Sequence, residues 1–260
     1  MNARFGVRRG KALAAIALAA TAASMIPGST AALADEKNIL ADNWGVITRN
    51  TIGSPVAVLR NGPVGSFGVP ASAARPPYGS GSLGIEVADK STSLATPGEK
   101  VDFGNEVDFY GNPVLGLDKV GFHVFQTSEN VGYGSPLTNM PTIRFEIDPN
   151  MTTGDNYSTL VWNPPPSPVV DRWSPYLDAT TTGTWFLTGN ETSCTQTAPC
   201  NFDRLKASFT GGVGRPTILT VAVGKGRDHM WIGAVDGLRI NRNIYDFEAD
   251  GVKTRFQPFG

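Results

Sequence analysis

The sequence contains few side chains suited to metal binding or redox chemistry, with two cysteines and two histidines among 260 residues. Neither His123 nor His229 lies near the cysteines in sequence, so no local motif supplies the four ligands of a structural zinc site. An excess of charge of one sign is also lacking, because 22 Lys and Arg residues face 23 Asp and Glu residues. Since binding to phosphates requires a basic surface, we expect no nucleic-acid partner.

Long hydrophobic runs are absent after the N-terminal region. There, several basic residues precede an apolar run over residues 12–23, and an A-x-A cleavage pattern follows. This pattern predicts a signal peptide over residues 1–34. It also predicts a secreted, extracellular chain over residues 35–260, which we expect to form a single β-sandwich domain with no transmembrane segment after cleavage. The Arg8-Arg9 pair leaves the Sec and Tat export routes both open.

The two cysteines lie close together, as Cys194 and Cys200 in a threonine-rich stretch. In an oxidising extracellular environment, neighbouring cysteines most simply pair with each other. The sequence therefore predicts a disulfide that closes one surface loop.

Helical periodicity is nearly absent, which favours a β fold. Many short segments instead alternate apolar with polar or small residues and are separated by turn residues. One helix is predicted over residues 202–209, with Asn201 as its N-cap. The predicted fold is all-β, an antiparallel two-sheet β-sandwich of jelly-roll type with one short helix. The predicted strands cover residues 55–60, 83–87, 107–110, 120–126, 142–148, 158–163, 183–188, 216–223, 231–240 and 244–248.

The last two predicted strands form a hairpin on which the rest of the sheet is expected to build. An Asn-rich turn at residues 241–243 joins them, and asparagine tolerates the positive φ that such turns require. Strict alternation predicts two faces for the first strand. Ile232, Ala234, Leu238 and Ile240 are expected on one face, and Trp231, Val235 and Arg239 on the other.

Several motifs, taken in order, resemble those of secreted bacterial β-sandwich proteins. They are Gly81-Ser82-Leu83, Trp173 followed by Trp185-Phe186, the short helix, and the segments 221–226, 234–238 and 245–248. The chain is similar in these motifs to carbohydrate-binding jelly-roll modules and laminin-G-like domains. The resemblance covers most of the chain after the signal peptide and implies a fold, but it carries over no activity.

The resemblance also implies that a structural Ca²⁺ ion could be present, because similar jelly-roll modules often hold one. The hairpin supplies the hard oxygen ligands that calcium requires, with Asp236, Asp246 and Glu248 as candidates and Asp250 close by. The alternative is that these carboxylates are ordinary solvated side chains of a hairpin.

One segment suggests glycosidase chemistry. Arg144-Phe145-Glu146-Ile147-Asp148 resembles the E-I-D opening of the catalytic strand in concanavalin-like retaining glycosidases, which implies Glu146 and Asp148 as catalytic candidates. The second Glu of that pattern is missing, since Met151 stands in its place and Pro149 is expected to end the strand. The alternative is a structural strand whose Glu146 and Asp148 are solvated or paired across the sheet.

Aromatic residues between positions 163 and 183 suggest a sugar-binding surface. Sugar rings stack on aromatic side chains while their hydroxyls bond to polar groups. Trp173 and Tyr176 are therefore the predicted stacking residues, and the predicted polar rim consists of Asp171, Arg172 and Asp178. The alternative for each tryptophan is that it packs in the core.

Three functions are consistent with these observations. The first is a secreted, non-catalytic protein that binds a glycan or cell-surface polysaccharide. The second is a polysaccharide-active glycoside hydrolase or lyase that uses Glu146 and Asp148. The third is a structural envelope protein without a small ligand. The missing acid at Met151 favours the first over the second.

Overall fold

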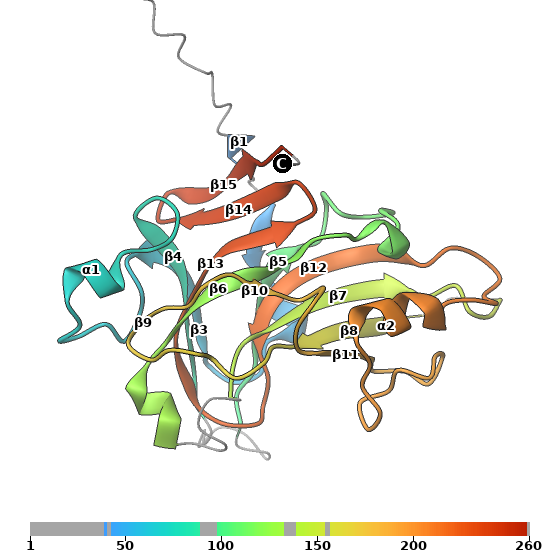
Figure 1. Ribbon diagram of the computed structural model, residues 1–260, viewed down its shortest axis with the longest axis horizontal. Helices are drawn as coiled ribbons and strands as arrows, with labels where there is room; N and C mark the ends of the chain where they lie inside the picture. The colour runs from blue at the N-terminus through green and yellow to red at the C-terminus, as the bar shows by residue number, and fades with distance from the viewer. Residues whose placement is uncertain (1–38, 41–42, 89–97, 133–138, 154–156, 259–260) are drawn as a thin grey trace, which may run out of the picture. The chain divides into compact units, whose positions relative to one another are not determined.

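Two antiparallel β-sheets form the structure (Figure 1). The computed structural model describes residues 39–40, 43–88, 98–132, 139–153 and 157–258. The larger sheet has nine strands. They are β1 (Ile39–Leu40), β3 (Val56–Asn61), β4 (Gly81–Val87), β6 (Val120–Gln126), β9 (Arg172–Trp173), β10 (Leu177–Asp178), β13 (Trp231–Ile240), β14 (Asn243–Glu248) and β15 (Gly251–Phe256).

The smaller sheet has six strands in the order β11-β8-β7-β12-β5-β2. Their bounds are β2 (Trp44–Val46), β5 (Val101–Asn105), β7 (Thr142–Asp148), β8 (Ser158–Asn163), β11 (Thr184–Leu187) and β12 (Thr217–Lys225). Residues Glu36–Gly260 form one compact unit, and the predicted signal peptide lies outside the described residues.

The hydrophobic core lies between the two sheets. Leu83 and Ile85 of β4 enter it from the nine-stranded sheet, and Phe145, Trp162 and Trp185 enter it from the six-stranded sheet. All five are fully buried. The structure therefore confirms the predicted all-β two-sheet fold, and Trp162 and Trp185 pack in its core.

The faces of the closing hairpin differ from the prediction. Trp231 and Val235 share the core with Leu238 and Ile240, which strict alternation places on the opposite face. The reason is a β-bulge between Asp236 and Arg239, at which the register with β6 shifts. Gly237 occupies the bulge with φ +61°, and the extra residue reverses the alternation after it. The predicted turn is confirmed, with Asn241 at φ +56°.

The strand predicted at residues 107–110 is wrong. This segment is a turn that follows β5. The Asn105 side chain accepts hydrogen bonds from the backbone N–H groups of Val107 and Asp108, at 3.0 and 2.8 Å. A side chain that bonds in this way folds the backbone into an Asx-turn, which competes with strand pairing.

The predicted helix is confirmed as α2 (Phe202–Ser208), which lies against β11 (Figure 1). The Asn201 side chain caps it by accepting a hydrogen bond from Arg204 N at 2.9 Å. A four-residue helix, α1 (Ala71–Ala74), was not predicted. The described residues also include three short 3-10 helices: η1 (Thr48–Asn50), η2 (Val114–Gly116) and η3 (Ser128–Gly132).

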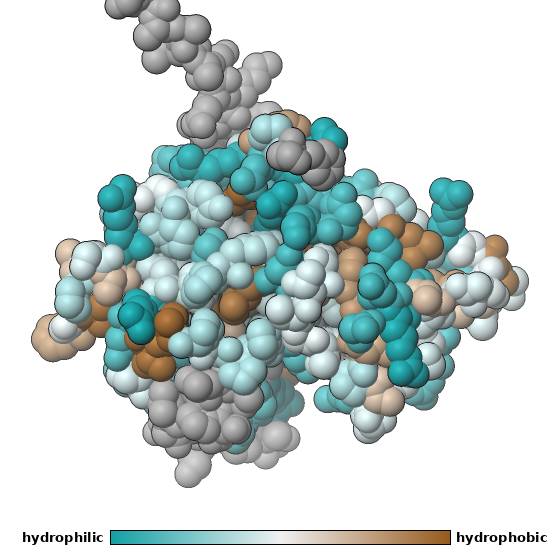
Figure 2. Space-filling model, in the orientation of Figure 1, coloured by the Kyte–Doolittle hydropathy of each residue, from teal (hydrophilic) through white to brown (hydrophobic). Residues whose placement is uncertain are grey.

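Hydrophilic side chains cover most of the face seen in Figure 2, and apolar side chains there form small, separate groups. Scattered surface hydrophobic residues of this kind are normal for a folded domain. Within the described part of the chain, no helix is long and apolar enough to span a membrane.

Candidate ligand-binding face

The outer face of the six-stranded sheet carries polar side chains. On β7, Ile143, Phe145 and Ile147 are fully buried in the core. Because successive strand residues point to opposite faces, Arg144 and Glu146 lie on the outer face. The prediction that β7 ends before Pro149 is confirmed.

A hollow of about 500 Å³ lies over this face. The register places Ala222, Arg144, Val161 and Phe186 side by side across four strands, as one row of its floor. Glu146 and Thr159 belong to the neighbouring row. The floor therefore combines charged, hydroxyl and apolar side chains within one open concave site, which is the composition of small-ligand sites.

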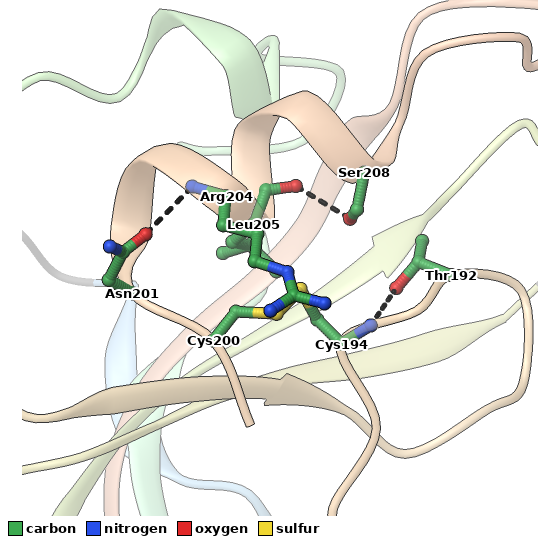
Figure 3. Close-up of a disulfide and its surroundings, with 7 residues drawn as sticks. All are labelled: Thr192, Cys194, Cys200, Asn201, Arg204, Leu205 and Ser208. Carbon is green, nitrogen blue, oxygen red and sulfur yellow. Dashed lines mark hydrogen bonds between the residues drawn. A yellow bond between two sulfur atoms is a disulfide. The ribbon is translucent and has the colours of Figure 1, made fainter. Parts of the chain in front are cut away.

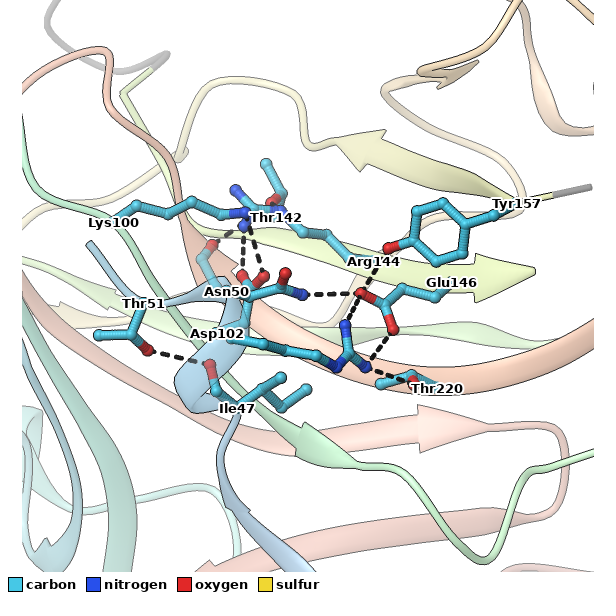
Figure 4. A network of polar contacts seen from close by, with 12 residues as sticks. Ile47, Asn50, Thr51, Lys100, Asp102, Thr142, Arg144, Glu146, Tyr157 and Thr220 are labelled. Carbon is cyan, nitrogen blue, oxygen red and sulfur yellow. Dashed lines mark hydrogen bonds and ion pairs between the residues drawn. The ribbon is translucent and has the colours of Figure 1, made fainter.

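Glu146 is the most heavily hydrogen-bonded side chain of the floor (Figure 4). The Arg49 guanidinium forms a bidentate ion pair with it, with Nη1–Oε1 and Nη2–Oε2 distances of 2.5 Å each. Asn50 Nδ2 donates to Oε1 at 2.8 Å, and the Tyr157 hydroxyl donates to the same oxygen at 2.7 Å. These donors hold the carboxylate in one orientation.

These contacts also set the charge of Glu146. Burial acts to raise its pKa, but the hydrogen bonds from Arg49, Tyr157 and Asn50 together outweigh burial and lower the pKa to about 2. The carboxyl group is therefore ionised at neutral pH. In this state it accepts protons and hydrogen bonds but has no proton to donate as a general acid.

Backbone hydrogen bonds on both sides of Arg49 position it at the edge of the hollow. The 3-10 helix η1 contains Arg49 and follows β2 directly. Ile47 N donates to Asp102 O at 2.9 Å, and Ile52 pairs with Lys100 through backbone hydrogen bonds of 2.9 and 3.0 Å. Both ends of the segment are thus tied to the β5 edge, which fixes the position of Arg49.

A second buried carboxylate, Asp102 of β5, lies on the same face. Arg144 Nη1 donates to it, and Lys100 Nζ lies 3.5 Å from its other oxygen. Gly224 of the neighbouring strand β12 makes room for it, because a Cβ there would lie 1.9 Å from Asp102 Oδ1. Two cations therefore share one carboxylate beside the hollow.

The second catalytic candidate does not face Glu146 across the hollow. Asp148 lies at the end of β7, where its Oδ1 accepts a hydrogen bond from Asn150 N at 2.9 Å, and it is not among the residues that line the hollow. Met151 packs against the core. The catalytic role of Glu146 and Asp148 stays a prediction, because the hollow lies over Glu146 and not over Asp148.

The disulfide between Cys194 and Cys200 is present, as predicted (Figure 3). It closes a loop along the free edge of β11, where Leu187 N donates to Cys194 O at 2.8 Å. Cys200 exchanges two backbone hydrogen bonds with Trp185, at 2.7 and 2.8 Å. The loop carries Gln196 to the lining of the hollow.

The predicted stacking residues lie on the other sheet. Their segment is not a free loop, because β9 and β10 pair with β6. Trp173 is half-buried, packs edge-to-face on Phe125 and donates from Nε1 to Ala74 O at 3.1 Å. Tyr176 is half-buried beside His123, and burial raises the pKa of its hydroxyl. Their role in binding stays a prediction.

Two residues of the predicted polar rim form contacts with neighbouring segments of the protein. Asp171 has φ +55°, and its Oδ1 accepts a hydrogen bond from Ser128 N at 2.9 Å. Asp178 forms an ion pair with Lys119 at 2.5 Å. Arg172 is exposed on β9. The five predicted binding residues are absent from the lining of the hollow over the six-stranded sheet.

The hairpin carboxylates are buried, which contradicts the solvated alternative for all but Asp250. Asp236 accepts hydrogen bonds from Phe247 N at 3.2 Å and Tyr78 N at 3.1 Å. Glu248 accepts one from Ser80 N at 2.9 Å, and Asp246 pairs with Arg255. Among the described residues, no group of three His, Cys, Asp or Glu side chains could hold a metal ion.

The calcium site therefore stays a prediction without geometric support. The acidic residues of the hairpin instead accept hydrogen bonds from backbone N–H groups, and in this way they tie residues 78–80 to β13 and β14. Burial and the charge of Asp246 raise the pKa of Asp236 to about 8.

Sequence patterns locate part of the candidate face. The alternation over residues 142–148 places Arg144 and Glu146 together on the outer side of a strand. No pattern identifies Arg49, Asn50 or Tyr157 as partners of Glu146, because two of them lie almost one hundred positions earlier in the chain. The third lies just before β8, where its hydroxyl reaches across to β7.

Comparisons with protein-family models and with curated proteins give no match for this chain. The resemblance to carbohydrate-binding jelly-roll modules rests on the sequence motifs and stays a prediction. The fold class and the geometry of the hollow are therefore the observations from which a function can be inferred.

Proposed function

We propose that this chain is an exported, non-catalytic glycan-binding protein whose ligand lies in the hollow over the six-stranded sheet. The predicted signal peptide and the Cys194–Cys200 disulfide support export, since disulfides persist in oxidising compartments. The binding site differs from the one predicted around Trp173.

One observation carries the proposal: the floor of the hollow is polar, yet its polar groups are held in place before any ligand arrives. Glu146 is held by three donor side chains and Asp102 by two cations. Val161 and Phe186 add two adjacent apolar side chains, and Ala222 lies on the other side of Arg144. A sugar has this same combination of hydroxyl groups and apolar C–H faces.

Fixed polar groups also reduce the entropy lost on binding, because side chains that are already ordered need not be ordered by the ligand. An ionised Glu146 has the charge state of a nucleophile, so catalysis would also need a general acid beside it, and the candidate Asp148 is not among the residues that line the hollow. Together these features support binding without turnover.

The test is binding of the chain without residues 1–34 to a panel of immobilised polysaccharides. Thr159→Trp places a large ring on the floor of the hollow and should weaken binding by more than about 10-fold. Thr254→Trp is the matched control, because it places the same ring on β15 of the other sheet. Thermal melting of both variants establishes that each is folded.

Two results would contradict the proposal. If Trp173→Ala abolishes binding while Thr159→Trp does not, the site is the aromatic segment predicted from the sequence. If no polysaccharide binds, a structural envelope protein is the better interpretation. A third assay measures release of reducing sugars and unsaturated products, where turnover that Glu146→Gln removes would favour the hydrolase or lyase alternative.

A further inference from the structure

Three ion pairs beside the hollow, Arg49–Glu146, Lys100–Asp102 and Arg144–Asp102, share an asymmetry of exposure. The Glu146 side chain is 4% exposed, whereas that of its partner Arg49 is 48% exposed. The Asp102 side chain is 1% exposed, whereas those of Lys100 and Arg144 are 26% and 11% exposed. In these three pairs the carboxylate is more deeply buried than its cation, so a ligand that enters the hollow meets the cation first. Arg49 also pairs with Glu106, whose side chain is 49% exposed.

One end of the hollow has an excess of cations. Lys100, Arg144 and Arg227 line this end together with two carboxylates, Asp102 and Asp228. A further cation, Lys225, is fully buried next to them and pairs with Asp228, whose side chain is 56% exposed. In this pair the order of exposure is reversed.

The cations at this end therefore outnumber the carboxylates, and Asp102, which already accepts two of them, is almost fully covered. A neutral sugar hydroxyl is bound best where exposed donors and acceptors are mixed. Here Lys100, Arg144 and Arg227 are donors that are at least partly exposed, whereas the exposed carboxylate, Asp228, already pairs with Lys225. Donors are therefore in excess, and the ligand has to supply acceptors. Guanidinium and ammonium groups bind carboxylate and sulfate oxygens through charge-assisted hydrogen bonds.

We propose that the end of the hollow lined by Lys100, Arg144 and Arg227 binds an anionic substituent of the glycan, namely a uronate carboxylate or a sulfate ester. This inference rests on the proposed function and specifies its ligand class. Long-range attraction from these cations also makes binding sensitive to ionic strength.

The experiment compares four immobilised ligands: a polyuronate, the same polyuronate after chemical reduction of its carboxyl groups, a sulfated galactan and a neutral glucan. The reduced polymer keeps the backbone of the polyuronate and lacks its charge. We expect the polyuronate or the sulfated galactan, or both, to bind at least about 10-fold more tightly than the two neutral polymers, with affinity falling as salt is added. Which anionic polymer binds identifies the substituent.

Lys100→Gln should weaken binding to the anionic polymer by about 3- to 10-fold, because it removes one cation and leaves Arg144 on Asp102. Lys253→Gln is the matched control. Lys253 is also ion-paired and 25% exposed, but it lies on β15 of the other sheet. Its affinity should equal that of the unmodified chain, and thermal melting checks that both variants fold.

Equal affinity for the polyuronate and its reduced form, with no binding of the sulfated galactan, would overturn this inference and leave the proposed function standing. An equal loss in Lys253→Gln and Lys100→Gln would also overturn it, because the effect would then come from net charge. Absence of binding to all four polymers would overturn the proposed function as well.

Discussion

Two groups of buried carboxylates are held in opposite ways. Glu146 and Asp102, beside the hollow, are paired with arginine and lysine side chains. Asp236, in the closing hairpin, accepts hydrogen bonds mainly from backbone N–H groups. Its neighbour Asp246 has Arg255 on one oxygen, while the other oxygen is buried without a hydrogen-bond partner.

The difference shows what each region is suited to do. The hydrogen bonds from Arg49, Tyr157 and Asn50 keep the pKa of Glu146 low, so this carboxylate stays charged and ordered next to solvent. In the hairpin, burial without an equivalent set of cations raises the pKa of both Asp236 and Asp246. The hairpin carboxylates are suited to holding a loop in place. The carboxylates beside the hollow are suited to contacting a ligand.

The largest expected effect comes from disturbing the cation-paired group. Gly224→Ala places a Cβ 1.9 Å from Asp102 Oδ1 and 2.5 Å from the Val101 backbone oxygen. Asp102 and its cations, or the strand itself, must then move. We expect a loss of about 2 to 3 kcal/mol in the free energy of unfolding, as for an overpacked core site, measured by urea denaturation.

Gly45→Ala is the control for this substitution. Gly45 lies in β2 of the same sheet, and nothing lies within 4 Å of the position its Cβ would occupy. Its free energy of unfolding should change by less than about 1 kcal/mol. Equal losses in the two variants would show that strand flexibility, and not the room for Asp102, determines the effect.

The second prediction is that the two groups respond to pH in opposite directions. The folded-state pKa of Glu146, about 2, is below its unfolded value, so its stabilisation is present above about pH 4.5 and is lost as pH falls toward 2. The pKa of Asp236, about 8, is above its unfolded value. Its stabilisation is therefore present below about pH 4 and is lost as pH rises through 8.

Urea denaturation between about pH 3 and pH 9 measures both effects. A calcium chelator is added, so that no calcium ion binds the hairpin carboxylates in place of a proton. Glu146→Gln should flatten the acid side of the stability profile, and Asp236→Asn should flatten the alkaline side. If Asp236→Asn leaves the alkaline side unchanged, the carboxyl group of Asp236 is not protonated in the folded state and the comparison fails for the hairpin.

Much of the fold could be predicted from the sequence because one face of nearly every strand is buried. The alternation in β4, β6, β7 and β8 determines both the strands and their core residues. The prediction missed the strands β1, β2, β5, β9, β10 and β15. It was wrong where a local backbone feature interrupts this pattern. The bulge at Gly237 reversed the faces of β13, and the Asn105 side chain replaced a strand with a turn.

The candidate site could be predicted less well, because long-range pairing assembles it. Trp173 and Tyr176 were predicted to stack on a sugar because they are aromatic residues in a proline-rich segment. Pairing with β6 makes that segment part of the nine-stranded sheet. Glu146 was identified by its motif. The partners that fix its charge, Arg49 among them, come from a segment with no recognisable motif.

The smallest expected effect concerns Gln196, which extends the comparison from the charged floor to the rim of the hollow. Its side chain is exposed on the disulfide-closed loop, so Gln196→Ala should change the free energy of unfolding by less than about 0.5 kcal/mol. One amide hydrogen bond to a ligand contributes about 0.5 to 1.5 kcal/mol, which predicts a loss of glycan affinity of roughly 2- to 12-fold.

Gln257→Ala, at an exposed position after β15, is the control and should bind normally. Normal binding by Gln196→Ala as well would confine the ligand to the floor of the hollow, and the disulfide loop would then serve to cover the free edge of β11.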